Sequence, residues 1–296
     1  MQALTAFTLA LALAFSMPYG MAASNTKINV VTTTTDLKSL VTSVGGDRVT
    51  VESIAAPDQD PHSMELKPIQ LIRLRDADLV VRIGMDHEPW LARMSTNAQV
   101  LNTSNNVQLV QTETPRLRAE RRAHVHAYGN THYWLDPENA RPITASITET
   151  LSKLRPADRQ YFEANREKFL RDLDVRLKAW KIAMEPYRGT KVVVMHDSWS
   201  YFAKRFGLSI VAAAEPTPGV PPSPAELSKL FVRMRDAGVK IVIADPNSNP
   251  GVVRQVAEHG GARAVTLVPS VLADPLARDY LSMLDLNVER FVGGLR

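Results

Sequence analysis

Two blocks of alternating strand and helix signals, separated by one long helical segment, constrain this chain more than any other feature. Short β-branched runs are typical of buried strands, and helix-like stretches follow most of them. The runs lie at residues 28–33, 48–54 and 79–83 in the first block, and at 191–195, 209–213, 240–244 and 264–268 in the second. Strand-then-helix alternation predicts largely parallel sheets covered by helices, so we expect an α/β protein with two βα lobes.

Residues 156–184, between the two blocks, carry the strongest helix pattern of the chain. One face is marked by apolar residues three, four or seven positions apart, namely Phe162, Phe169, Leu173, Leu177, Trp180 and Met184. Pro156 suits a first helical turn, and Pro186 suits a stop. A helix of this length would be about 40 Å long and would join the lobes as a rigid strut. Shorter helices are expected at residues 36–44, 68–77, 224–237 and 274–292.

The uncharged apolar run at residues 3–17, followed by the small residues Ala22 and Ala23, indicates the compartment. It has the length of the apolar core of a secretory signal peptide and is too short to span a bilayer comfortably. No Lys or Arg precedes it, so a buried N-terminal helix is the alternative. No later run reaches the about 20 apolar residues that a span needs. We therefore expect a signal peptide at 1–23, an N-terminal lobe at 24–155, a linking helix at 156–186 and a C-terminal lobe at 187–296.

Composition excludes several function classes. The 35 Lys and Arg residues against 31 Asp and Glu give a formal charge of only +4, which does not argue for nucleic-acid binding. The 45% of hydrophobic residues are enough for ordinary cores, which excludes a disordered chain. Cysteine is absent, so disulfides, a thiolate nucleophile, Cys-based zinc modules, iron–sulfur clusters and a lipid-anchored N-terminus are excluded.

Three of the seven histidines stand where chemistry is expected. His62 follows the second predicted strand, His132 stands at the entry to a helix, and His196 follows the strand at 191–195. Ligands of open α/β sheets bind outside the carboxyl ends of the strands. Neutral imidazoles from distant segments suit zinc, and neighbouring carboxylates can fix their tautomers. Those carboxylates are Asp60, Glu65, Asp136 and Asp197. Each histidine alone also fits a hydrogen-bonded loop or core residue.

The other histidines give weaker signals. His124 and His126 form a His-x-His pair, but Tyr128-Gly129 stands where a metallo-β-lactamase-type zinc site needs Asp-His. The hydrolase motifs HExxH and GxSxG are also absent. We interpret His87 and His259 as surface or helix-end residues.

With these residues in view, the chain resembles the zinc/manganese solute-binding proteins of bacterial ABC importers, from about residue 27 to the C-terminus. The resemblance is carried by five short motifs in order: Asp60-Pro61-His62-x-x-Glu65-x-Lys67-Pro68, Gly84-Met85-Asp86-His87-Glu88-Pro89-Trp90-Leu91, His132-x-Trp134-Leu135-Asp136-Pro137, His196-Asp197-x-x-x-Tyr201-Phe202 and Pro222-Ser223-Pro224-x-Glu226-Leu227. It implies a two-lobed periplasmic receptor, a monomer that holds a metal ion in the interlobe cleft and delivers it to an inner-membrane ABC permease.

The resemblance also implies a ligand set, with one departure. The family's first three ligands fall on His62, His132 and His196. Many members have an aspartate after a late strand, where this chain has Val268, which cannot ligate. The fourth position is then open to water or filled by Asp245, our tentative fourth ligand. His124 and His126 stand where zinc-type members carry a metal-capturing loop, and they either capture metal or are incidental histidines of a loop.

The donor set favours zinc as the transported ion. Three nitrogens with at most one oxygen suit zinc better than manganese, which prefers carboxylate-rich octahedral surroundings. A manganese or iron receptor of the same family is one alternative. A zinc hydrolase is another, with water at an open fourth position and Asp245 or Glu65 as general base. Adhesion is a third class, which nothing in the sequence supports or excludes.

Overall fold

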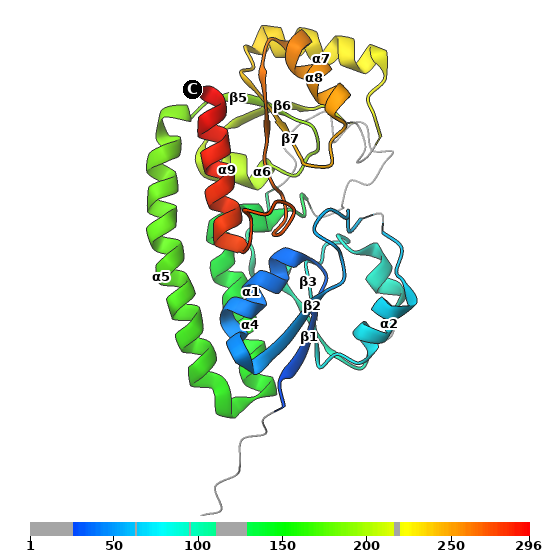
Figure 1. Cartoon of the computed structure of the whole chain (residues 1–296), viewed down its shortest axis with the longest axis vertical. Helices are drawn as coiled ribbons and strands as arrows, with labels where there is room; N and C mark the ends of the chain where they lie inside the picture. Colours follow the sequence, from blue (N-terminus) through cyan, green and yellow to red (C-terminus); the bar gives the residue numbers. More distant parts are fainter. Residues whose placement is uncertain (1–25, 63, 95, 111–128, 216–219) are drawn as a thin grey trace, which may run out of the picture.

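The computed structural model describes residues 26–62, 64–94, 96–110, 129–215 and 220–296. Two four-stranded parallel sheets lie one above the other along the long axis of the molecule (Figure 1). The expected α/β fold with two parallel-sheet lobes is confirmed. No helix of the described ranges is long and apolar enough to cross a membrane.

The two sheets share one strand order. The N-terminal sheet contains β1 (Ile28–Thr32), β2 (Val49–Ser53), β3 (Leu79–Arg82) and β4 (Gln99–Asn102), in the order β2-β1-β3-β4. The C-terminal sheet contains β5 (Lys191–Val194), β6 (Ser209–Ala213), β7 (Ile241–Ala244) and β8 (Arg263–Thr266), in the order β6-β5-β7-β8. In each sheet the second strand in the chain lies on one side of the first strand and the third lies on the other side, so the strand order reverses between β1 and β3 and between β5 and β7. Ligands of such sheets bind at this point, outside the carboxyl ends of the strands. β4 was not predicted, because this half-exposed edge strand has no β-branched run.

A layer of long helices covers one face of both sheets. It consists of α1 (Thr35–Gly45), α4 (Ala140–Leu154), α5 (Arg159–Met184) and α9 (Tyr280–Leu295). The largest hydrophobic core runs without a break from the strands of one sheet, through α5, to those of the other. The opposite faces are covered separately, by α2 (Pro68–Arg75) in the N-terminal lobe and by α7 (Pro224–Ala237) and α8 (Pro250–Gly260) in the C-terminal lobe. One shared core therefore joins the lobes.

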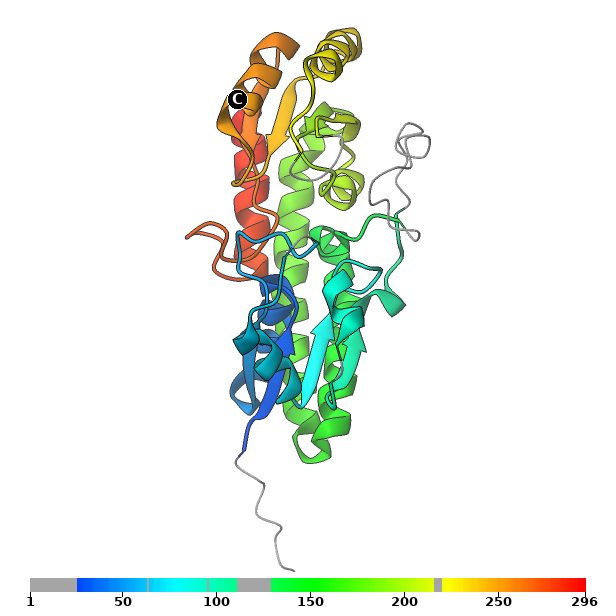
Figure 2. The same ribbon diagram turned by 90° about the vertical axis from the view of Figure 1, so that its right-hand side faces the viewer.

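The long helix α5 runs beside both lobes, as the two views show (Figures 1 and 2). Short 3-10 helices precede and follow it, at Pro156–Asp158 and Glu185–Tyr187. All six residues of the predicted apolar face are buried, and they are the only buried residues of this helix. The prediction for the last helix was partly wrong: α9 begins at Tyr280 and not near residue 274, because the Asp279 side chain accepts the Ser282 N–H and caps the helix there.

Hydrogen bonds between the lobes add to this core. The Trp134 indole donates to the Pro269 carbonyl at 2.9 Å, and the Tyr280 hydroxyl donates to the Trp134 carbonyl. The Asp36 carboxylate on α1 accepts the Val271 N–H at 3.0 Å. The segment after β8 is therefore tied to the N-terminal lobe at several points.

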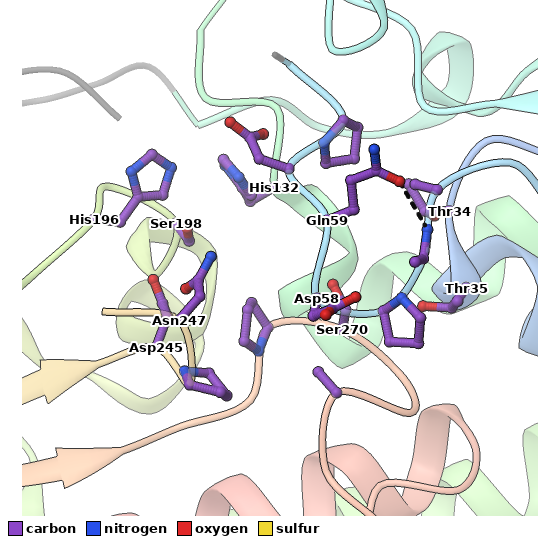
Figure 3. Close-up of a pocket in the computed structure, with 18 of the residues that line it drawn as sticks. Thr34, Thr35, Asp58, Gln59, His132, His196, Ser198, Asp245, Asn247 and Ser270 are labelled. Carbon is purple, nitrogen blue, oxygen red and sulfur yellow. Dashed lines mark hydrogen bonds between the residues drawn. The ribbon is translucent and has the colours of Figure 1, made fainter. Parts of the chain in front are cut away.

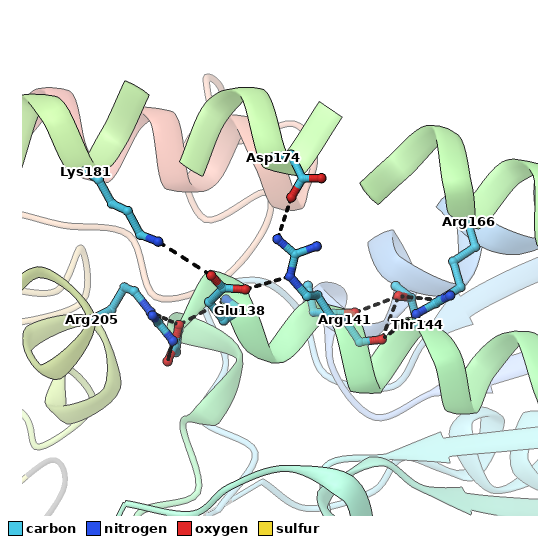
Figure 4. Close-up of polar contacts among 9 residues, drawn as sticks. Glu138, Arg141, Thr144, Arg166, Asp174, Lys181 and Arg205 are labelled. Carbon is cyan, nitrogen blue, oxygen red and sulfur yellow. Dashed lines mark hydrogen bonds and ion pairs between the residues drawn. The ribbon is translucent and has the colours of Figure 1, made fainter. Parts of the chain in front are cut away.

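An ion-pair network continues this connection to α5 and to α6 (Ser200–Phe206) (Figure 4). Arg205 on α6 forms a two-pronged pair with Asp136 at 2.6 and 2.8 Å. Glu138 pairs with Arg141 at 2.6 Å and with Lys181 of α5 at 3.7 Å. These groups are partly exposed, so each pair contributes little to stability, but together they fix the segment that follows His132.

Asp36 is expected to make the stability of the protein pH-dependent. Burial raises the pKa of Asp36 to about 7. Hydrogen bonds from the Val271 N–H and from its own backbone N–H lower this pKa and so oppose the effect of burial. Since the unfolded carboxyl has a pKa near 3.8, the folded state binds more protons between these values, and stability falls as pH rises through this window. From pH 5 to pH 7 the expected loss is roughly 2 kcal/mol, at about 1.4 kcal/mol per pH unit.

The measurement is urea unfolding of wild type and Asp36→Asn between pH 4.5 and 7.5. The Asn side-chain oxygen can still accept the Val271 N–H, so the variant should lose the roughly 2 kcal/mol that Asp36 contributes to the pH dependence and keep the part due to Asp245, whose pKa burial also raises to about 7. Asp236→Asn on the exposed side of α7 controls for the loss of one carboxyl group. Parallel pH profiles for wild type and Asp36→Asn would contradict the prediction.

Candidate metal centre

A cavity of about 510 Å³ lies between the carboxyl ends of the two sheets. Its walls come from the loops after β1, β2 and β3 and from residues 132–134 on one side, and from the loops after β5, β6, β7 and β8 on the other. His132 and His196 lie beside each other at one end, with Asp245 and Asn247 on the C-terminal wall and Asp58 across from them (Figure 3). The two lobes therefore share one polar cavity.

His62 lies in the loop between β2 and α2 and is half-buried. Its backbone N–H donates to Asp60 Oδ1 at 2.9 Å, which closes a tight turn. The Trp90 indole donates to the Pro61 carbonyl at 2.9 Å and ties this turn to the loop after β3. His62 is thereby fixed from two directions.

His132 is oriented by Asn130, which also contacts the other lobe. Asn130 Oδ1 accepts the His132 backbone N–H at 2.9 Å and lies 3.1 Å from His132 Nδ1. A proton on Nδ1 completes this bond and makes Nε2 the candidate metal-binding atom. The Asn130 amide group donates to the Asp197 carbonyl at 2.7 Å, beside His196. One buried amide thus links the backbones that carry His132 and His196.

His196 follows β5 directly and comes from the C-terminal lobe. Burial lowers the pKa of its imidazole, and the charge of Asp60 opposes this shift. A lowered pKa keeps the ring neutral, which is the form that binds metal. The next residue, Asp197, accepts the hydroxyl of Ser200, the first residue of α6, at 3.0 Å.

Of the three predicted histidines, His132 and His196 line this end of the cavity, and His62 lies beside His132. The ring centre of His132 is 5.7 Å from that of His62 and 5.6 Å from that of His196. Within the described residues, the set whose candidate ligand atoms all lie within 4.8 Å of one another contains His62 and His132, with His87 as its third member. His196 adjoins this set through His132.

The interpretation of His87 as a surface or helix-end residue was wrong. Its side chain is 1% exposed, and its ring centre lies 4.3 Å from that of His62 and 5.5 Å from that of His132. The signal was available in the sequence, because His87 comes shortly after β3 and the carboxyl ends of parallel strands face the ligand. His259 does lie in the last turn of α8, as predicted, with Nδ1 3.0 Å from the Gln255 carbonyl.

Asp245, the tentative fourth ligand, lines the same cavity, but one of its oxygens is already hydrogen-bonded to Trp199. Its Oδ1 accepts the Trp199 indole N–H at 2.9 Å, and burial raises its pKa to about 7, with the Glu215 charge acting in the same direction. Val268 is fully buried, and its N–H and carbonyl are both bonded to the Asn287 side chain. His124 and His126 lie outside the described residues.

Comparison with known proteins identifies the family. Residues 30–294 match the family model described as zinc-uptake complex component A, periplasmic. This chain belongs to that family. The zinc-uptake family consists of solute-binding receptors of ABC importers and not of enzymes, so the hydrolase alternative is not favoured. Membership implies a metal ion and an ABC permease as partners.

Individual relatives and solved structures agree with this assignment. The high-affinity zinc uptake system protein ZnuA of Yersinia pestis is 25% identical, over 97% of this chain and 96% of its own length. That of Paracoccus denitrificans is 27% identical, over 82% and 85%. A crystal structure of ZnuA has a TM-score of 0.78 at 24% identity and covers 92% of this chain and all of that one. A Mn-bound periplasmic metal-binding protein from Candidatus Liberibacter asiaticus, 18% identical and covering 91% and 100%, has the same fold with a TM-score of 0.77.

Proposed function

We propose that this chain captures Zn²⁺ in the interlobe cavity, with His62, His132 and His196 as ligands, and delivers it to its permease. The strongest support is the pair of ring-centre distances, 5.7 Å from His132 to His62 and 5.6 Å from His132 to His196, because imidazoles of both lobes lie next to His132. Coordination offsets the loss of the ion's hydration shell, and no bond of a substrate is broken.

Zinc is favoured over Mn²⁺ and Fe²⁺ by the donors. Imidazole nitrogens suit zinc, whereas manganese prefers carboxylates and water. Asp245, the tentative fourth donor, brings only one carboxylate, and its Oδ1 already accepts the Trp199 indole N–H. The Zn²⁺ relatives named above support the same choice.

The remaining parts of the proposal concern export and assembly. The apolar run at residues 3–17 acts as a signal peptide that is cleaved near Ala23. The receptor then works in the periplasm as a monomer, without nucleic acid. Its lobes are residues 24–155 and 187–296, joined by the linking helix 156–186.

A metal titration tests the proposal. We expect purified wild-type protein to bind one Zn²⁺ tightly and Mn²⁺ at least about 100-fold more weakly, measured by competition with a chromophoric chelator. Affinity should fall as pH is lowered from 7.5 to 5.5, because the imidazoles must be neutral to bind. Elemental analysis of protein purified from its native compartment should show zinc. Tighter binding of Mn²⁺ than of Zn²⁺, or no binding of either ion, would overturn the proposal.

A further inference from the structure

The loop after β3 brings a fourth imidazole to the candidate metal centre. We propose that His87 is a direct ligand of the transported ion and completes a site of four histidines. This inference rests on the proposed function, since it concerns the same site. His62, His87 and His132 come from the N-terminal lobe and His196 comes from the C-terminal lobe.

The backbone that carries His87 is strained. Gly84, Met85 and Asp86 have φ angles of +84°, +57° and +59°. L side chains rarely adopt this conformation, so Met85 and Asp86 are strained, and such strain is common at ligand sites. Gly84 is closely packed against Asn102, because a Cβ at residue 84 would lie 2.1 Å from Asn102 Oδ1, so a residue with a side chain does not fit there.

A buried carboxylate holds this strained loop in place. Glu88 is fully buried, and its Oε1 accepts the Thr33 hydroxyl and the Ile83 N–H, both at 2.6 Å. Its Oε2 accepts the Gly84 N–H at 3.0 Å and lies 3.6 Å from the Arg82 guanidinium. The side chain after His87 therefore fixes both ends of the turn, so the position of the His87 ring is fixed before metal arrives.

The ring of His87 is oriented as a metal ligand requires. Its Nδ1 lies 2.9 Å from the Thr131 hydroxyl oxygen, just as His132 Nδ1 lies 3.1 Å from Asn130 Oδ1. A ligating histidine usually bonds its second nitrogen to a polar group of the protein, which fixes the ring. With the proton on Nδ1 of each ring, Asn130 and Thr131 orient His132 and His87 so that Nε2 is the nitrogen that binds the ion.

The separations are compatible with one shared ion. Candidate ligand atoms of His62, His87 and His132 lie within 4.8 Å of one another. Nitrogens around a tetrahedral zinc ion, each about 2.0–2.1 Å from the metal, lie about 3.3 Å apart. Each pair therefore has to approach by at most about 1.5 Å when the ion binds. The N-terminal lobe alone offers three nitrogens, and His196 closes the site from the other lobe.

A fourth imidazole also accounts for the missing carboxylate. Val268 replaces the aspartate expected at that position, and the Asn287 side chain holds its backbone in the core. One oxygen of Asp245 is bonded to Trp199. Four nitrogen donors leave no open position for an activated water, which suits a carrier of metal better than a hydrolase. They also strengthen the preference for zinc over manganese.

The test compares wild type with His87→Gln in Zn²⁺ competition titrations and counts ligands by X-ray absorption of the zinc-loaded proteins. We expect four imidazoles around zinc in wild type and three in the variant. The affinity of the variant for Zn²⁺ should be lower by about 10-fold to 100-fold. His259→Gln makes the same substitution on exposed α8 and should change neither result. Thermal unfolding of the metal-free proteins checks that the variant is folded.

The outcomes separate the two proposals. A wild-type protein that binds no zinc overturns the proposed function together with the role of His87. Zinc bound tightly by wild type through three imidazoles and an oxygen overturns the role of His87 alone. An unchanged affinity of His87→Gln for Zn²⁺ also overturns the role of His87 alone. The ligand count in wild type decides the question even if His87→Gln does not fold.

Discussion

Replacing His132 with alanine is expected to lower the affinity for Zn²⁺ by more than about 100-fold. The ring of His132 is the centre of the histidine group, with the rings of His62, His87 and His196 between 5.5 and 5.7 Å away. Loss of a residue that only orients a ligand typically costs 10–100-fold in metal affinity. Loss of His132, which is proposed to bind the ion directly, should lower the affinity for Zn²⁺ by more than this.

Chelator competition at pH 7.5 measures this effect. His259→Ala is the matched control, because His259 is exposed on α8 and its Nδ1 lies beside the Gln255 carbonyl. Unfolding of the metal-free variant should occur near the wild-type temperature, since His132 is half-buried and its loop is also held by the Asp136–Arg205 pair. Zinc affinity equal to that of wild type would remove His132 from the ligand set.

Replacing Trp180 with alanine is expected to destabilise the protein by about 3–5 kcal/mol, the usual cost of truncating a large buried aromatic side chain. Trp180 lies on α5 in the core that the two lobes share, and it is 4% exposed. Its indole N–H donates to Asp285 Oδ1 on α9 at 2.8 Å, so the substitution also removes a contact between these helices.

Urea unfolding monitored by circular dichroism measures the change. Val175→Ala, on the same helix, is the control, because Val175 is 72% exposed and its truncation should change stability by less than about 0.5 kcal/mol. Equal free energies of unfolding for the two variants would contradict the prediction that the buried face of α5 stabilises the protein. Because the shared core joins the lobes, we expect Trp180→Ala to unfold in one transition.

Patterns that depend on neighbouring residues could be predicted from the sequence. The buried face of α5 follows from apolar residues three, four or seven positions apart, since 3.6 residues per turn bring them to one side. The parallel sheets follow from alternating strand and helix signals. His62 and His196 could be proposed as ligands because each follows a strand, and strand ends meet at one edge.

What required the tertiary structure was the contact of segments far apart in the chain. His87 looked like a surface residue because its own segment shows neither strain nor burial, and both arise from Glu88, Thr33 and Thr131 packing around it. Asn130 likewise joins the backbones of His132 and His196 only once the lobes meet. Sequence periodicity reports which side of an element is apolar, whereas the donors that surround one ion are set by loops whose relative positions only the packed core fixes.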